Sequence, residues 1–350
     1  MNFCSDNASA ACEAVMSRVV RANTGFEASY GTDQYSLRVE EKLRKIFEHD
    51  SAIVFPVATG TAANALALSV MCPSHGAVFC HRLAHVNIDE CGAPELMTGG
   101  AKLIPIDDCG DQDGRHGKIN PDAFKSLLDE GWSGVVHHAQ PACLTITQLS
   151  EYGTAYSLDE LKTLCDIAHD YGLYVHMDGA RFANALVGLD CSPAEMSWKL
   201  GVDALSFGAT KNGALGAEAV IFFTENLASE FGYKRKRAGH LFSKMRYISA
   251  QLEGYLDDDV WLQNARHANQ AATRLQMGLS AISGVECAYD VGGNELFVHL
   301  PEQVVKALNE VGYSFYNWPW GGKDCQRLVT AWNTNPQDVE GFISTVQQSI

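Results

Sequence analysis

Short apolar runs alternate with amphipathic stretches over the first two thirds of the chain. Leu37, Leu43 and Ile46 lie on one side of a helix that the pattern predicts over 36–48. Asn120-Pro121 indicates a second helix start, because proline is favoured at the first helical position. The further predicted strands are 52–55, 77–80, 102–106, 134–137, 173–178, 204–207 and 219–223, and the further helices are 60–71 and 157–171. This order predicts an α/β fold with a doubly wound, mainly parallel sheet and ligands at the carboxyl ends of its strands.

The pattern changes after residue 231. A long helical stretch is expected to about residue 282, with a break near Asp257-Asp258-Asp259. Strands at 295–299 and 327–332 and a terminal helix from Pro336 follow. We therefore predict a large domain over residues 1–235, which includes the N-terminal segment, and a smaller C-terminal α+β domain over residues 236–350.

Composition narrows the class of protein. The 350 residues are 46% hydrophobic and carry a formal net charge of −16, which argues against nucleic-acid and anionic-membrane partners. The basic run 234–237 is an exception in this acidic sequence. The eleven cysteines form no C-x-x-C pair, so neither a metal site nor a disulfide framework is expected. No apolar run reaches membrane-spanning length and the first residues lack a signal peptide, so we expect a cytoplasmic protein.

Asp178 is the first candidate for chemistry. It directly follows a predicted strand, where a carboxylate faces the ligand crevice of a doubly wound sheet. An acid there can pair with a protonated ring nitrogen, as pyridoxal-phosphate enzymes require. Taken alone, Asp178 is better explained as a helix N-cap with Arg181 as its partner.

Lys211 is the second candidate. It lies among small residues after a predicted strand, in the stretch 206–217. Small neighbours allow a bulky cofactor to approach the backbone, and a desolvated lysine amine can attach covalently to a carbonyl group. A lysine on an exposed turn is the alternative.

A third element is the turn 58–64, where a predicted strand leads through Gly60, Thr61 and Ala62 into a helix. Backbone N–H groups at such a helix start suit a phosphate. The segment is neither G-x-G-x-x-G nor a P-loop, and an ordinary strand–helix turn is the favoured explanation when it is considered alone.

These elements occur together in an order that resembles a known family. Residues 176–185 read H-M-D-G-A-R-F-A-N-A, which is close to the H-x-D-G-A-R-x-x-N-A segment of the threonine aldolases, a β-eliminating lyase family of fold-type I pyridoxal-phosphate (PLP) enzymes. Residues 3–7, Tyr30-Gly31 and 327–330 are similar to its opening, its Y-G element and its C-terminal arginine strand. The resemblance extends over the whole chain and is strongest to the bacterial low-specificity branch, close to the phenylserine aldolases.

The resemblance implies a role for each matching residue. Lys211 would attach the cofactor, Asp178 would pair with its ring nitrogen, His85 would stack over the ring, and Gly60, Thr61 and Ala62 would bind its phosphate. The residues assigned to the substrate are Ser5, Tyr30, Arg181 and Arg327, and Arg181 would also lie near the cofactor. Tyr30, with Arg237 or Lys236, would reach the cofactor of a neighbouring subunit, which implies a homo-oligomer, expected to be a tetramer.

One departure concerns the catalytic base. Many members of the family carry an E-N-T-H histidine, whereas the corresponding stretch 145–151 contains no histidine here. The pair His137-His138 lies too early in the chain to replace it. His85 or a bound water is therefore the preferred base for the β-hydroxyl proton.

The expected activity is reversible, PLP-dependent cleavage of β-hydroxy-α-amino acids to glycine and an aldehyde, with Lys211, His85 and Asp178 as catalytic residues. One alternative is another reaction on the same cofactor, such as β-elimination or transamination. A second alternative is a non-catalytic cofactor-binding or assembly protein, in which the loss of Lys211 or Asp178 would be expected.

Overall fold

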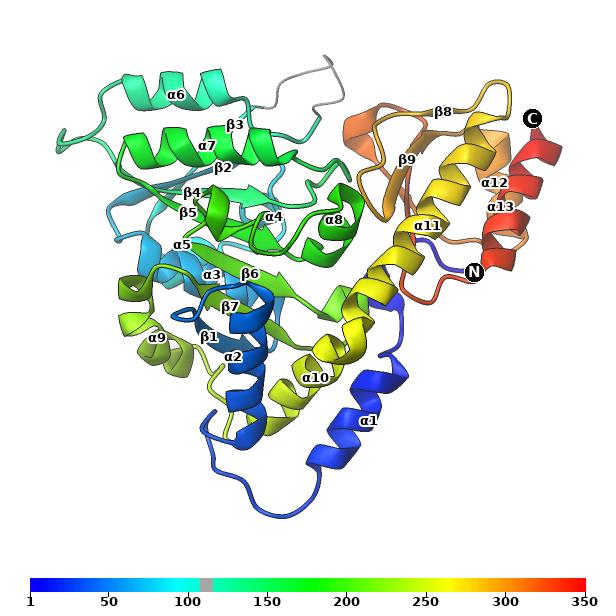
Figure 1. The fold of residues 1–350 in the computed structure, drawn as a ribbon. Coiled ribbons are helices and arrows are strands. Elements are labelled where there is room, and N and C mark those ends of the chain that lie inside the picture. The colour runs from blue at the N-terminus through cyan, green and yellow to red at the C-terminus, as the bar shows by residue number, and fades with distance from the viewer. Residues whose placement is uncertain (108–115) are drawn as a thin grey trace.

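The computed structural model describes residues 1–107 and 116–350 (Figure 1). A seven-stranded sheet has the order β1-β7-β6-β5-β4-β2-β3. Neighbouring strands from β3 to β6 are parallel, and β7 runs antiparallel to both β6 and β1. The strands are β1 (Ile53–Val57), β2 (Gly76–His81), β3 (Lys102–Ile106), β4 (Gln140–Thr147), β5 (Tyr174–Gly179), β6 (Ala204–Gly208) and β7 (Glu218–Phe222).

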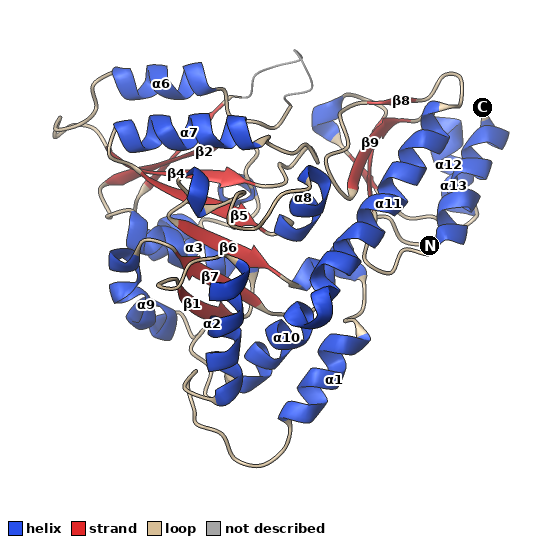
Figure 2. Ribbon diagram, viewed as in Figure 1, coloured by secondary structure: helices blue, strands red, loops and turns tan. Residues whose placement is uncertain are grey.

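Helices cover both faces of this sheet (Figure 2). The period-two alternation of a strand sends Val220 and Phe222 to one core and Ile221 to the other. One face is covered by α3 (Gly60–Met71), α4 (His85–Ile88), α5 (Ala93–Thr98) and α9 (Phe231–Arg237). The other is covered by α2 (Gln34–Ile46), α6 (Pro121–Asp129), α7 (Leu158–Asp170), α8 (Phe182–Leu189) and α10 (Arg246–Leu256). The predicted doubly wound fold is confirmed.

The strand predicted at 134–137 is wrong. These residues form turns, with Gly134 at φ +77° and Val136 92% exposed. The side-chain Nε2 of Gln140 holds the turns, since its two hydrogens are shared among the carbonyls of Trp132, Val135 and His138. The strand that enters the sheet is β4, whose residues Cys143, Leu144 and Ile146 are fully buried. The strand propensity of Val135 and Val136 led to the wrong prediction. Burial between parallel neighbours is what places β4 in the sheet instead.

The predicted long helix after residue 231 is divided more often than expected. The predicted break at 257–259 is confirmed, because Asp258 and Asp259 have φ near +50°. A second break, which the apolar pattern did not predict, separates α9 from α10 at residues 238–245. Gly239, at φ +77°, lies in that break.

The smaller antiparallel sheet has the order β10-β11-β9-β8. The N-terminal segment joins it, because Phe3 N–H donates to Ser314 and Phe3 C=O accepts from Val329 N–H. The predicted domain boundary at 235 falls inside α9 and stays a prediction. The remaining elements are α1 (Glu13–Ala22), α11 (Val260–Ser280), β8 (Glu286–Cys287), β9 (Glu295–His299), α12 (Glu302–Glu310), β10 (Tyr316–Asn317), β11 (Cys325–Val329) and α13 (Pro336–Ser349).

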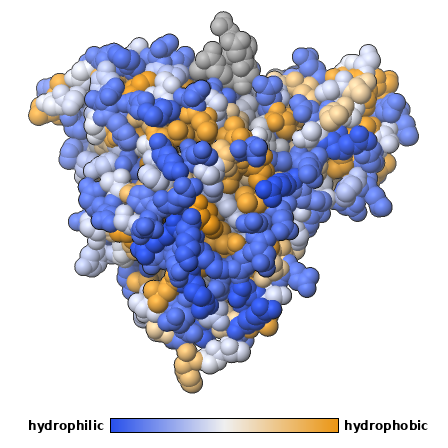
Figure 3. Space-filling view, in the orientation of Figure 1, coloured by the Kyte–Doolittle hydropathy of each residue, from blue (hydrophilic) through white to orange (hydrophobic). Residues whose placement is uncertain are grey.

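The outer surface is mostly hydrophilic on the face that Figure 3 shows, with apolar residues gathered toward its middle. Within residues 1–107 and 116–350, no helix combines the length and the apolar character needed to cross a membrane.

Candidate active site

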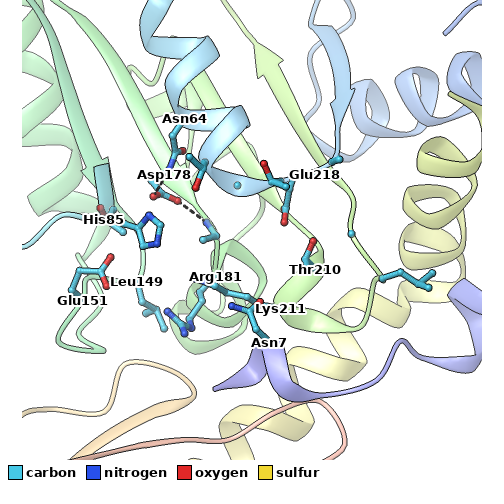
Figure 4. A pocket seen from close by; sticks show the side chains of 18 residues that line it. Asn7, Asn64, His85, Leu149, Glu151, Asp178, Arg181, Thr210, Lys211 and Glu218 are labelled. Carbon is cyan, nitrogen blue, oxygen red and sulfur yellow. Dashed lines mark hydrogen bonds between the residues drawn. The ribbon is translucent and has the colours of Figure 1, made fainter. Parts of the chain in front are cut away.

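A cavity of about 350 Å³ lies at the carboxyl edge of the parallel strands (Figure 4). This is a size typical of small-molecule sites. Because β7 is antiparallel, its first residue, Glu218, reaches the same edge as the last residues of β4 and β5. The described residues that line the cavity are Asn7, Ala58, Thr59, Gly60, Thr61, Asn64, His85, Thr147, Leu149, Glu151, Asp178, Ala180, Arg181, Thr210, Lys211, Leu215, Gly216 and Glu218.

Lys211 is half-buried in the short 3-10 turn η3 (Thr210–Asn212) that follows β6. The turn approaches the end of β5 closely, since a Cβ at Gly208 would lie 2.6 Å from the carbonyl oxygen of Ala180. Glu218 fixes the turn by accepting from Ala209 N–H at 2.8 Å. Burial raises the pKa of Glu218 to about 7, despite hydrogen bonds from Thr210 and the Ala209 backbone.

Asp178 is 3% exposed at the end of β5. Its Oδ2 accepts from the side-chain amide of Asn64 at 2.8 Å, and its Oδ1 accepts from Ala180 N–H at 3.0 Å. These two donors fix the orientation of the Asp178 carboxyl group beside the cavity. Beneath it in β5, His176 is fully buried between the hydroxyls of Thr145 and Ser206.

The turn into α3 supplies unpaired backbone donors. Thr59 caps the helix by accepting from Ala62 N–H at 3.2 Å. In the described part of the chain, the N–H groups of Gly60 and Thr61 have no hydrogen-bond acceptor, and both residues line the cavity. Such donors at a helix N-terminus fit an anionic group such as a phosphate.

His85 begins α4 and its ring points into the cavity in Figure 4. Its Nδ1 lies 2.8 Å from Oε1 of Glu90, a carboxyl whose side chain is completely buried. The hydrogen bond to Glu90 raises the pKa of His85, against the effect of burial and with support from Asp178 and Glu151.

Arg181 connects the large sheet to the N-terminal segment and the small sheet. Its Nε and Nη2 donate to the two carboxylate oxygens of Asp6, and its Nη1 lies 3.1 Å from Glu295 Oε2. Burial opposes the charge of Arg181, but Asp6 and Glu295 more than offset this effect and raise its pKa. Glu295 also accepts two hydrogen bonds from Arg327.

The cavity therefore brings together six of the residues predicted from the sequence, namely Gly60, Thr61, His85, Asp178, Arg181 and Lys211. Five others do not line it, namely Ser5, Tyr30, Ala62, Arg237 and Arg327.

Each of these five has other surroundings. Ser5 caps the 3-10 turn η1 (Asp6–Ala8), and the N–H of Ala62 is taken by Thr59. Arg327 is separated from the cavity by Glu295 and Arg181. Tyr30 and Arg237 are exposed, and Lys236 lies 4.7 Å from the centre of the Tyr30 ring. Their predicted role at a neighbouring subunit's cofactor stays a prediction.

Sequence reasoning missed several residues at or beside the cavity. Asn64 lies one helical turn after Gly60, a spacing that could have placed it on the same face. Glu218 begins an antiparallel strand, so only the sheet topology reveals its position. Within the stretch 145–151, which lacks the expected histidine, Thr147, Leu149 and Glu151 face the cavity. Neither His137 nor His138 lines it.

Comparisons with known proteins agree with this arrangement. A family model described as beta-eliminating lyase matches residues 2–301. The chain is 40% identical over 345 residues to the low specificity L-threonine aldolase of Pseudomonas sp. (strain NCIMB 10558), covering 99% of this chain and 96% of that protein. A solved threonine aldolase from Leishmania major has a TM-score of 0.90 at 27% identity, covering 99% of this chain and 98% of that one.

A more distant neighbour in fold is a serine palmitoyltransferase from S. paucimobilis with bound PLP, with a TM-score of 0.68, 15% identity and coverage of 100% and 87% of the two chains. At that identity the comparison concerns the fold alone. The family model and the Pseudomonas relative both extend over most of the sequence, and the chain therefore belongs to the beta-eliminating lyase family.

Proposed function

We propose that this protein is a PLP-dependent aldolase that cleaves β-hydroxy-α-amino acids, such as L-threonine, L-allo-threonine or phenylserine, reversibly to glycine and an aldehyde. The observation that carries the proposal is the convergence of the Lys211 amine, the Asp178 carboxylate and the unpaired N–H groups of the α3 turn on one cavity. The names of the Pseudomonas and Leishmania relatives support this choice of reaction.

The residues present fit PLP as the cofactor. Lys211 would attach it, Asp178 would hold its ring nitrogen protonated, and Gly60 and Thr61 would bind its phosphate through the donors that have no other acceptor. His85 would stack over its ring. When bound, PLP supplies an electron sink for the carbanion that forms when the Cα–Cβ bond breaks.

The chain's own side chains would orient the amino acid and move its protons. Asp6 and Glu295 engage one hydrogen on each of the three Arg181 nitrogens, so the second hydrogens of Nη1 and Nη2 remain for the substrate carboxylate. His85, whose Nε2 is not engaged by Glu90, would accept the β-hydroxyl proton directly or through a water. Glu151 lies on the same wall, and burial raises its pKa.

We also propose a cytoplasmic homotetramer in which Tyr30 and the basic run contact a neighbouring subunit. Two exposed aromatic residues beside that run support the assembly: Tyr233 directly precedes it, and the ring of Tyr30 lies 4.7 Å from Lys236. The cysteines of the described ranges are free, which fits a reducing compartment. Light scattering coupled to gel filtration gives the subunit number directly.

A substrate panel tests the reaction. The purified protein with added PLP should release glycine from L-threonine, L-allo-threonine and phenylserine, and Lys211→Ala should release none. The main alternative, suggested by the name of the matching family, is β-elimination, which yields ammonia and a keto acid. Release of those products without glycine would overturn the proposal.

A further inference from the structure

The buried carboxyl of Glu90 lies between two parts of the candidate active site. Glu90 follows α4, does not line the cavity and is 4% exposed. Its Oε1 lies 2.8 Å from His85 Nδ1 and accepts from the Asn64 amide at 2.9 Å. The same amide nitrogen donates its second hydrogen to Asp178. One amide therefore joins the carboxyl behind His85 to the carboxyl at the end of β5.

These contacts fix the direction of the hydrogen bonds. Asn64 uses both of its N–H hydrogens on carboxylate oxygens, and in the described part of the chain its own oxygen has no partner. Glu90 Oε1 already accepts one of those hydrogens, so it is arranged to accept a second one from His85 Nδ1. A proton on Glu90 would belong on Oε2, which is buried and without a partner in the described residues. His85 is therefore the donor whether Glu90 is ionised or neutral.

The arrangement has a consequence for the imidazole. A neutral histidine that donates through Nδ1 has its lone pair on Nε2. Glu90 engages Nδ1 and does not line the cavity, whereas His85 does, so Nε2 is the nitrogen that remains available to the cavity. An aspartate holds the histidine of a serine-protease triad in the same way, by fixing both tautomer and orientation.

We propose that Glu90 is a positioning residue that holds His85 as the Nδ1–H tautomer and so presents a basic Nε2 to the substrate's β-hydroxyl. The proposal rests on the proposed aldolase function for its kinetic consequence. Its structural part, the tautomer, concerns the protein alone and is tested without a substrate.

Several charged groups besides Glu90 affect the pKa of His85, and they bear on any change in that pKa in a Glu90 variant. Glu90 acts from the segment after α4, Asp178 from β5 and Glu151 from the loop after β4, and all three favour protonation of the imidazole, while burial opposes it. Glu90 itself faces Asn64 of α3 and the charge of Asp178. A change confined to Glu90 leaves the other two carboxyls in place.

Two substitutions separate the charge of Glu90 from its hydrogen bond. Glu90→Gln retains an oxygen that can accept from His85 and removes the negative charge. Glu90→Ala removes both. The matched control is Glu95→Gln on α5, a partly buried carboxyl for which the structure shows no contact with His85. Circular dichroism and thermal unfolding check that each variant is folded.

Nitrogen-15 NMR of histidine-labelled protein without cofactor reports the tautomer, and His85→Asn identifies the signal. We expect Nδ1–H in the wild type, in Glu90→Gln and in Glu95→Gln, and a mixture of tautomers in Glu90→Ala. The pKa of His85 should fall in both Glu90 variants and stay unchanged in Glu95→Gln. A wild-type ring with its hydrogen on Nε2, or an unchanged tautomer in Glu90→Ala, would overturn the proposal.

Kinetics of the PLP-loaded enzyme test the consequence. Glu90→Ala should lower kcat for threonine cleavage by about a hundredfold, with a smaller change in KM, because the base loses its orientation. In a His85→Asn background the same substitution should have almost no further effect, since both act through one group. An equal loss in both backgrounds would show that Glu90 does not act through His85. If the wild type cleaves no β-hydroxy amino acid, the proposed function fails, and the NMR experiment still decides the tautomer.

Discussion

Arg327 offers a test of how the substrate carboxylate is bound. Its Nε and Nη2 donate to Glu295 Oε1 at 3.1 and 2.6 Å, and Glu295 in turn pairs with Arg181 at the cavity. The Arg327 side chain is 17% exposed. If Arg327 also pairs with the substrate carboxylate, as the family resemblance implies, removing it from that desolvated pair should cost about 2–5 kcal/mol, which corresponds to a loss in kcat/KM of roughly 30- to 5,000-fold for Arg327→Ala. Arg327→Lys should recover only part of it, because an ammonium cannot reproduce the two-pronged contact.

The loss of global stability should be smaller than the kinetic loss. Glu295 keeps Arg181 as a partner, so it is not left as an isolated buried charge, a situation that costs about 3–5 kcal/mol. Urea unfolding measures the loss of global stability, and steady-state kinetics with L-threonine measures the loss in kcat/KM. Arg274→Ala is the matched control, since Arg274 also donates through Nε and Nη2 to a glutamate, Glu340, but on the exposed surface, and its kcat/KM should change by less than about twofold. An unchanged kcat/KM in Arg327→Ala would refute a role for this residue in substrate binding.

Three further predictions follow from the cavity and the sheet beneath it. Lys211→Ala should abolish turnover, and borohydride reduction of the wild type should leave the cofactor on the peptide that contains Lys211; label on another peptide would refute the assignment. Asp178→Asn should lower kcat by roughly a hundredfold, about 3 kcal/mol, with the fold intact, and a kcat near wild type would identify another partner for the ring nitrogen. Burial lowers the pKa of His176 to about 4, so the unfolded chain binds more protons below pH 6.5, and unfolding free energy should fall by about 3 kcal/mol as the pH drops from 6.5 to 4. Urea titrations of His176→Asn should show a smaller loss over that range, and an equal loss would exclude this histidine as the cause.

Local patterns predicted much of the fold. The helix at 60–71 and the strand at 102–106 have the predicted bounds, and Ser157 and Glu160 form the capping box that their spacing indicates. The error at 134–137 shows the limit of such patterns. A pair of valines has high strand propensity, but parallel pairing with β2 and β5 selected residues 140–147 instead.

The site could be predicted only where its residues follow strand ends. Asp178 and Lys211 belong to that group. Asp6 reaches Arg181 from 175 positions away, and Glu90 meets Asn64 through the packing of separate segments, so no spacing in the sequence indicated either contact. The polar groups that hold the candidate catalytic residues in place are therefore a property of the tertiary structure.

The reaction products test the central claim most directly. The purified protein with PLP is incubated with L-threonine, and glycine, acetaldehyde, ammonia and 2-oxobutanoate are quantified, with Lys211→Ala as the control. The aldolase assignment predicts glycine and acetaldehyde in equal amounts, formed by the wild type alone. Ammonia and 2-oxobutanoate without glycine would contradict it.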